Sequence, residues 1–223
     1  MSSSTSPPPE RFTARITGRH DEGGGLVTVE LLPAPKAAAS YTTPGQYVQV
    51  HVDDVRGYFA LASEEGAGTW QLLVRENPGA ASALLRAAVG SPVQVTAAMG
   101  RGFPLEEARD RRLAIAVTAG ALGPALPAVA RRIRDGLADR TVLFVGTHSP
   151  AGLAKVSTLE ALRARGVKVH TVMSEAAGEH LSGFVQDHLH LASPEVVWVV
   201  GIPAMVDAVK AWGRERGVDV RTN

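Results

Sequence analysis

The sequence has no cysteine, few aromatic residues and no excess of charge of either sign. Without cysteine, the chain cannot form a disulfide, a thiolate nucleophile, an iron–sulfur cluster or a cysteine-ligated zinc site, so redox chemistry would require a bound organic cofactor. The 23 basic and 22 acidic residues leave a net charge of +1, which gives no electrostatic argument for a nucleic acid or an anionic membrane as partner. The composition is that of an ordinary globular protein.

Long hydrophobic runs are also missing. No apolar run approaches the roughly 20 residues of a membrane span, and the first residues, MSSSTSPPPERF, lack the basic-then-apolar layout of a signal peptide. We therefore expect a cytoplasmic protein. Residues 1–10, which are rich in Ser and Pro, are expected to form a disordered lead-in.

Residues 11–110 are predicted to form an antiparallel β-barrel. Six short segments are rich in β-branched or aromatic residues and are separated by Gly, Pro or charged residues: RFTARITGRH, LVTVELL, GQYVQVHV, YFALAS, WQLLVRE and SPVQVTA. Between the last two, GAASALLRAAVG places Leu84, Leu85 and Val89 at helical spacing. We expect a six-stranded barrel with one crossing helix.

Residues 111–223 are predicted to form a doubly wound parallel sheet. The apolar runs LAIAVTAG, TVLFVGT, VKVHTVM and EVVWVVG are typical of strands buried on both faces. Helical patterns follow, most clearly in PALPAVARRIRDGL, KVSTLEALRARG and PAMVDAVKAWGRERG. The expected fold class is a β-barrel followed by an α/β half, with the boundary near residue 110.

Several motifs, in this order, resemble those of the ferredoxin-NADP reductase superfamily. TPGQYVQV, GYFALAS and LLVRENPGAASALL are similar to the family's PGQFV strand, its flavin-contacting RxYSxxS strand and its VK…GxxSxxL segment. MGRGFPL, VTAGALGPA, GFVQDHL and VGIPAMVDAV are similar to the GPxGxxF turn, the AGGTGIAP loop, the GxVxxxL element and the CGPxxM ending. The resemblance covers nearly the whole chain after the lead-in. It implies that residues 11–110 bind FAD and that residues 111–223 bind NAD(P)H.

The start of the crossing helix is the candidate phosphate site. Gly79, Ala80, Ala81 and Ser82 would form its first turn, where backbone N–H groups lack acceptors and the positive end of the helix dipole favours an anion. Their small side chains would let a phosphate come close. A turn glycine followed by a capping serine is the structural alternative.

The strand with Tyr58 and Phe59 is the candidate flavin-ring site. Successive strand residues face opposite sides, so one of the two rings could stack on the isoalloxazine; alternatively, both belong to the barrel core and rim. The resemblance puts Phe59 at the family's tyrosine, Ala60 at its hydroxyl residue and Gly57 at its phosphate-binding arginine. Arg75 could supply positive charge to the phosphates instead. The remaining candidate flavin contacts are Leu61, Ala62, Ser63 and Val74.

The turn after the first strand of the α/β half is the candidate dinucleotide site. Thr118 ends that strand, and Gly120 and Gly123 keep two glycines of the family's loop, a geometry suited to a pyrophosphate near a helix N-terminus. Leu122 stands where the family has a hydroxyl. Because glycine turns after buried strands are common in α/β proteins, a purely structural role is the alternative.

Two further positions complete the candidate dinucleotide set. Glu175 stands where an NADP-selective member would have arginine, and a carboxylate repels a 2′-phosphate while accepting hydrogen bonds from ribose hydroxyls, so NADH is favoured. Gly201 and Met205 mark the last turn, where Val200 and Ile202 replace the family's cysteine and first proline.

No side chain is assigned a catalytic or metal-binding role. His180, His188 and His190 lack nearby carboxylates or thiolates in the order of a metal site, so we interpret them as surface histidines. Hydride transfer to a flavin needs no general acid or base, which agrees with the lack of a visible triad.

The sequence thus predicts an FAD-dependent oxidoreductase that takes electrons from NAD(P)H, preferably NADH, and passes them to an unidentified acceptor, possibly a protein. Two alternatives stay open. One is a degenerate relative that acts as a binding or regulatory module without NAD(P)H turnover. The other is an electron-transfer subunit of a larger flavoenzyme.

Overall fold

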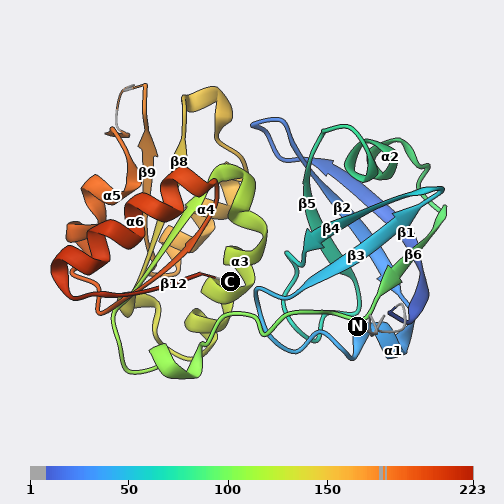
Figure 1. The fold of residues 1–223 in the computed structure, drawn as a ribbon, viewed down its shortest axis with the longest axis horizontal. Coiled ribbons are helices and arrows are strands. Elements are labelled where there is room, and N and C mark those ends of the chain that lie inside the picture. The colour runs from blue at the N-terminus through green and yellow to red at the C-terminus, as the bar shows by residue number, and fades with distance from the viewer. Residues whose placement is uncertain (1–8, 176–177, 179, 223) are drawn as a thin grey trace, which may run out of the picture.

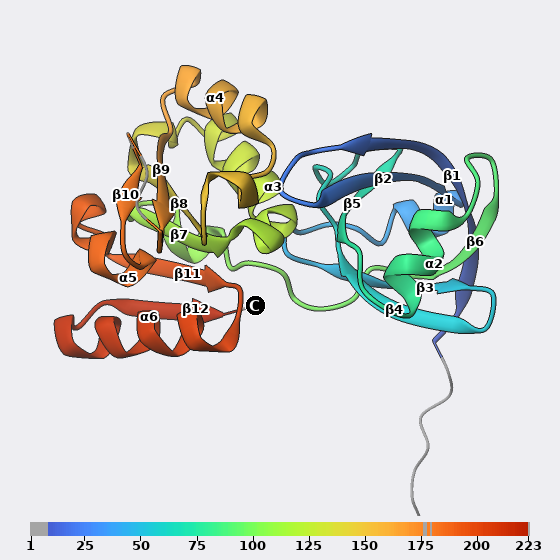
Figure 2. The same ribbon diagram turned by 90° about the horizontal axis from the view of Figure 1, so that it is seen from above.

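The computed structural model describes residues 9–175, 178 and 180–222. It shows two bodies side by side, each built on one six-stranded sheet (Figures 1 and 2). Most of the predicted disordered lead-in lies outside the described residues. None of the helices in the described part of the chain has the length and apolarity that a membrane span requires.

The first body is the predicted antiparallel barrel. Its strands lie in the order β4-β3-β6-β1-β2-β5. A bridge between Leu61 and Leu72 joins the end of β4 to β5, and so brings the two edges of the sheet together. The strand bounds are β1 (Arg11–Asp21), β2 (Leu26–Pro33), β3 (Tyr47–Val52), β4 (Val55–Ala60), β5 (Trp70–Arg75) and β6 (Pro92–Thr96).

The crossing helix is present as α2 (Ala80–Arg86), between β5 and β6. It buries Ala81 and Leu84 against the barrel core, beside the fully buried Trp70. The short helix α1 (Pro35–Ala38) was not predicted, because four residues are too few to show a helical period.

The second body is the predicted parallel sheet, with strand order β10-β9-β8-β7-β11-β12. Its strands are β7 (Leu113–Thr118), β8 (Thr141–Thr147), β9 (Lys168–Met173), β10 (Leu181–Ser182), β11 (Val196–Val200) and β12 (Asp219–Thr222). The four long apolar runs became β7, β8, β9 and β11, as expected. The edge strands β10 and β12 are short and partly exposed, so they carry no apolar run by which to predict them.

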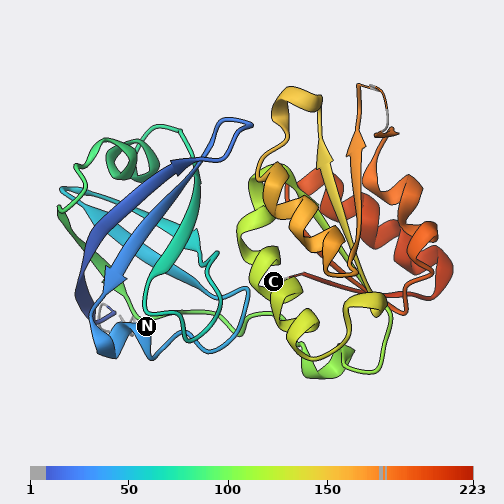
Figure 3. The ribbon, with the colours of Figure 1, turned by 180° about the vertical axis from the view of Figure 1, so that it is seen from behind.

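Helices cover both faces of this sheet, which makes it doubly wound. On one face, α3 (Leu122–Arg134) and α4 (Val156–Ala164) pack against Ile115 and Trp198. On the other, α5 (Val185–His188) and α6 (Pro203–Arg216) pack against Ala116 and Phe144. Figures 2 and 3 show α3 on the side that faces the barrel. Burial on both faces explains why these strands are almost wholly apolar.

The two bodies meet at three places. In the middle, Gly123 at the start of α3 lies against the barrel: a Cβ atom there would be 3.3 Å from that of Leu73 and 3.5 Å from that of Ala62. On one side, Arg131 and Arg134 of α3 form ion pairs with Glu65. On the other, the loop between β1 and β2 reaches the loop between β8 and α4 (Figures 1 and 3).

The segment that joins the sheets, residues 97–112, is held by both bodies: Met99 exchanges backbone hydrogen bonds with Tyr47 of the barrel, and the later residues contact the second body. Phe103 stacks on Trp198, with 4.9 Å between ring centroids and 6° between ring planes. The buried Arg132 of α3 donates hydrogen bonds to the carbonyl oxygens of Ala108 and Arg111. The expected domain boundary at residue 110 falls in this segment and stays a prediction.

Candidate functional site

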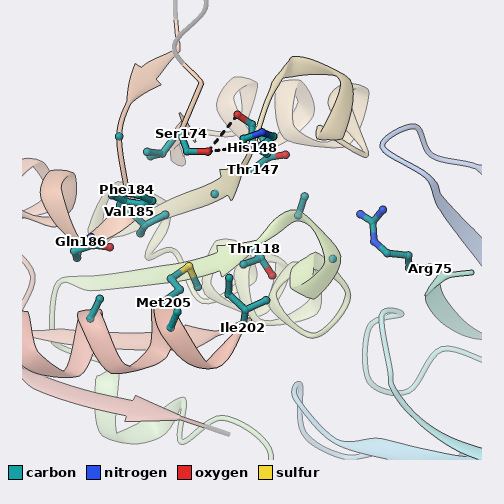
Figure 4. Close-up of a pocket in the computed structure, with 17 residues that line it drawn as sticks. Arg75, Thr118, Thr147, His148, Ser174, Phe184, Val185, Gln186, Ile202 and Met205 are labelled. Carbon is teal, nitrogen blue, oxygen red and sulfur yellow. Dashed lines mark hydrogen bonds between the residues drawn. The ribbon is translucent and has the colours of Figure 1, made fainter. Parts of the chain in front are cut away.

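A cleft of about 620 Å³ opens at the carboxyl ends of the parallel strands (Figure 4). In the sheet, β8 lies on one side of β7 and β11 on the other. The strand order therefore reverses between β7 and β11. Ligands of open α/β sheets bind at such a reversal, outside the carboxyl ends of the strands. The cleft therefore lies where this fold places a ligand.

Predicted residues near the carboxyl ends of β7 and β11 line the cleft. Thr118 ends β7, Gly120 lies in the turn that follows it, and Met205 comes from the first turn of α6. Gly201, which follows β11, lies next to two of them, because a Cβ atom at this position would be 2.8 Å from Met205 Cε and 2.9 Å from Thr118 Cγ2. Any larger residue would displace those two side chains, so glycine keeps this end of the cleft open.

Arg75 extends from the end of β5 across to the cleft (Figure 4). A Cβ atom at Gly120 would lie 3.9 Å from its Nε atom. Among the residues that the structure describes, no carboxylate forms an ion pair with Arg75. The sequence offers Arg75 as a possible source of positive charge for flavin phosphates, and the structure places this residue at the edge of the cleft.

His148 and Glu175 meet at the far side of the cleft, beyond the ends of β8 and β9. His148 Nε2 lies 3.1 Å from Glu175 Oε1, and His148 Nδ1 lies 2.7 Å from Ser174 Oγ. Both members of the ion pair are exposed. His148 and Ser174 line the cleft, so the Glu175 carboxylate stands beside it without being part of its wall.

Two predicted dinucleotide residues lie elsewhere. Leu122 is fully buried in the core of the second body, where the family's hydroxyl would have no cleft to face. Gly123 packs against the barrel. The motif places both residues in one loop with Gly120. In the structure, α3 begins at Leu122, so the helix directs the Leu122 side chain and the Cα hydrogens of Gly123 away from the cleft.

The barrel strand β4 separates its two aromatic side chains as predicted. Tyr58 is 68% exposed and meets Tyr47 edge to face at 5.8 Å, whereas Phe59 packs against the barrel core. Tyr58 is thus the ring that is free to stack on a ligand, although the resemblance favours Phe59. Ala60 is half-buried.

The other predicted barrel residues differ in what they offer. The side chains of Leu61 and Val74 lie in the barrel core, so only their main chain could contact a ligand. Ala62 faces Gly123 across the interface. Ser63 is buried, and its hydroxyl has no hydrogen-bond partner, while its carbonyl accepts a hydrogen bond from the Tyr41 hydroxyl at 2.7 Å.

The start of α2 is partly open. Gly79 caps the helix with φ +98°, and a Cβ atom there would meet nothing within 4 Å. By contrast, Ala80 and Ala81 are buried, and the Ser82 hydroxyl is engaged by Arg86. A Cβ atom at Gly57 would lie 2.8 Å from that of Ala80, so the gap in which the family's arginine would stand is closed.

The start of α2 and the exposed ring of Tyr58 fit a bound flavin, although the family's arginine is missing. The open side of Gly79 offers room for a phosphate beside backbone N–H groups, and Tyr58 offers an exposed ring for stacking. At the position of the family's arginine stands Gly57, and the neighbouring residue of β4, Arg56, is exposed.

Several residues of the cleft were missed at the sequence level. They come from the end of β8, from β9, from the start of GFVQDHL and from the region around the start of α6: Gly146, Thr147, Val172, Gly183, Phe184, Val185, Gln186, Ile202, Ala204 and Ala208. GFVQDHL was recognised as a family element, but small and apolar residues carry no chemical signal, so nothing in their types indicated a cleft wall.

Comparisons with known proteins agree with this geometry. No protein-family model matches the chain. The ferredoxin–NAD(+) reductase component of the alkene monooxygenase system of Xanthobacter autotrophicus is 26% identical over 219 residues, which are 92% of this chain and 66% of the relative. The chain therefore spans less than two thirds of the length of that relative.

Two solved structures share the fold. The cytochrome P450 reductase GcoB of Amycolatopsis superposes with a TM-score of 0.83 at 23% identity, over 96% of this chain and 69% of that one. The flavohem-like FAD/NAD-binding domain of nitric oxide dioxygenase from Vibrio cholerae gives 0.83 at 14% identity, over 95% and 97% of the two chains. The barrel, the crossing helix and the doubly wound sheet thus give this chain the fold of these two structures, and its ordered motifs resemble those of the ferredoxin-NADP reductase superfamily.

Proposed function

We propose that the protein is an FAD-dependent oxidoreductase that takes a hydride from NADH and passes the electrons to a separate acceptor. The observation that carries this proposal is the cleft at the strand-order reversal, which has the place and size for a dinucleotide and faces a cation from the barrel, Arg75. The Xanthobacter relative is a ferredoxin–NAD(+) reductase component, and the Vibrio structure is an FAD/NAD-binding domain.

Different residues of the chain would bind the different parts of the dinucleotide. Gly120, with its backbone at the turn after β7, and Arg75 would bind the pyrophosphate of the dinucleotide. Glu175, held by His148, would accept hydrogen bonds from the adenine ribose and repel a 2′-phosphate. Thr118 and Met205 would border the nicotinamide at the open end that Gly201 maintains.

Tyr58 and the backbone at Gly79 would hold the flavin ring and its phosphates on the barrel. The flavin, when bound, accepts two electrons from a nicotinamide and releases them one or two at a time. Hydride transfer requires no general acid or base from the described residues, because the protein would orient the two cofactors and exclude water. We propose a ferredoxin or an oxygenase component as the class of acceptor, because the Xanthobacter relative belongs to such a system.

The assignment of the cleft as the dinucleotide site can be tested by placing a side chain in it. Gly120 has an ordinary negative-φ backbone and a Cβ atom there would point toward Arg75, so Gly120→Leu places a side chain in the cleft without backbone strain. We expect calorimetric titration with NAD⁺ to give a dissociation constant raised at least about tenfold. Gly68→Leu is the matched control, because a Cβ at Gly68 meets nothing within 4 Å. Equal affinity in Gly120→Leu and wild type would contradict the assignment.

A further inference from the structure

The loop between β1 and β2 of the barrel is built around three consecutive glycines, Gly23, Gly24 and Gly25, with φ of +78°, +59° and +69°. Such a run of left-handed residues is strained for any other residue type. This loop, residues 21–25, is here called the glycine hairpin. It is a tight turn that closes the end of the hairpin and extends from the barrel toward the second body (Figures 1 and 3).

The glycine hairpin lies in direct contact with the β8–α4 loop, residues 148–155. A Cβ atom at Gly24 would be 2.6 Å from the carbonyl oxygen of Gly152, and one at Gly23 would be 3.2 Å from that of Leu153. Only residues without side chains allow two backbones to approach so closely. The close approach and the positive φ angles thus demand glycine for two independent reasons.

An ion pair fixes this contact. Glu22 and Lys155 join through two bonds: the Lys155 backbone N–H donates to the Glu22 carbonyl oxygen at 2.8 Å, and Lys155 Nζ lies 2.7 Å from Glu22 Oε1. Thr28 Oγ1 donates to the same carboxylate oxygen at 2.5 Å. The side chains of Lys155 and Glu22 are only 11% and 18% exposed, so water screens their attraction less than that of a surface pair.

The same hairpin contacts two segments that contribute residues to the cleft. The β8–α4 loop begins at His148, which lines the cleft and pairs with Glu175. A Cβ atom at Gly25 would lie 3.2 Å from Arg75 Nη1, so the hairpin also borders the guanidinium. Lys155 itself has the left-handed φ of +53°, which the contact with Glu22 holds in place.

We propose that the glycine hairpin, through Glu22 and Lys155, is a clamp that positions His148 and Arg75 for dinucleotide binding. Glu22 and Lys155 are positioning residues: neither lines the cleft. The proposal rests on the proposed function, because it assigns the clamp to the same cleft. It predicts that loosening the clamp weakens dinucleotide binding while the hydride-transfer rate at saturation is kept.

The variants are Gly24→Ala, which pushes the two loops apart, and Lys155→Met, which removes the ion pair but keeps an apolar stem. Each has a matched control. Gly66→Ala introduces the same strain at φ +78° in a loop where a Cβ meets nothing within 4 Å. Lys36→Met breaks an exposed lysine–glutamate pair elsewhere on the barrel. An additional double exchange, Glu22→Lys with Lys155→Glu, restores opposite charges across the contact.

Two readouts separate the clamp from the proposed function. Hydrogen exchange of amides 147–155 needs no nucleotide, and we expect faster exchange in Gly24→Ala and Lys155→Met but not in the controls. Steady-state kinetics should show the KM for NADH raised about fivefold or more with kcat within about twofold, and partial recovery in the double exchange.

Unchanged exchange in both variants would overturn the clamp, whether or not the wild type oxidises NADH. Faster exchange with an unchanged KM would overturn its positioning role. A wild type that neither binds nor oxidises NADH, in which the variants still exchange faster, would overturn the proposed function and the clamp's assignment to a dinucleotide, but not the contact itself.

Discussion

In the function that we propose, Glu175 is the residue that selects NADH over NADPH. Its carboxylate lies 3.1 Å from His148 Nε2 beside the cleft, where it would repel the 2′-phosphate of NADPH. We therefore propose that the choice between dinucleotides is electrostatic and depends on this single exposed carboxylate.

Replacing that carboxylate is expected to change the preference. Glu175→Arg should raise the ratio of kcat/KM for NADPH to that for NADH by about tenfold, because repulsion of the 2′-phosphate becomes attraction. Steady-state kinetics with both dinucleotides measures this ratio. Glu160→Arg makes the same charge change on the exposed side of α4 and should leave the ratio alone. An unaltered ratio in Glu175→Arg would remove its selective role.

A substitution at Gly79 tests the proposed site for the flavin phosphates. Glu placed there would put a carboxylate into the open space where a phosphate is expected, so Gly79→Glu should abolish retention of FAD through desalting. Gly90→Glu is a close control, since Gly90 has φ +94° and open space like Gly79 at φ +98°. Flavin content equal to the wild type in Gly79→Glu would contradict the phosphate site.

At the level of elements, sequence patterns predicted the strands and helices whose burial is complete. The alternation of Tyr58 and Phe59 followed from β4 geometry, and the apolar runs of β7, β8, β9 and β11 followed from burial on both faces. Leu122 shows why a motif alone can misplace a residue. Its position in the motif suggested a ligand contact, whereas a leucine side chain is typical of the core. The glycine hairpin was not predictable, because Glu22 and Lys155 lie 133 positions apart in the chain.

Helix α3 also fixes the joining segment, through Arg132. This guanidinium is 1% exposed and donates to Thr141 Oγ1 at 3.0 Å as well as to the carbonyl oxygens of Ala108 and Arg111. Arg132→Met should lower the free energy of unfolding by about 3 kcal/mol, since several buried acceptors lose their donor. Chemical denaturation measures the change, and Arg165→Met, at the exposed end of α4, should change it little. A loss as small as that of the control would contradict the anchoring role.

At the level of the whole molecule, the two bodies are held by groups that titrate. Burial alone would raise the pKa of Glu22, but the hydrogen bonds from Lys155 and Thr28 and the charge of Lys155 outweigh it and hold that pKa below its ordinary value. The stability that this carboxylate contributes is present above the ordinary glutamate pKa and is lost as the pH falls through the lowered one.

A comparison of Glu22→Gln with the wild type isolates this contribution. The difference in free energy of unfolding should be largest near neutral pH and should shrink as the pH falls through the lowered pKa of Glu22, because the wild-type carboxylate then becomes neutral too. Urea unfolding at a series of pH values checks the trend. A difference that stays constant throughout acid titration would show that the charge of Glu22 does not join the two bodies.

We propose that the barrel and the cleft act together as an NADH-dependent oxidoreductase with FAD as its bound cofactor. The most direct test of this proposal is the absorbance spectrum of the purified protein, incubated with FAD and desalted, before and after anaerobic addition of NADH and then, in a separate sample, NADPH. We predict a retained flavin band that bleaches with NADH faster than with NADPH. A protein that retains no flavin, or whose flavin stays oxidised with both dinucleotides, would contradict the account.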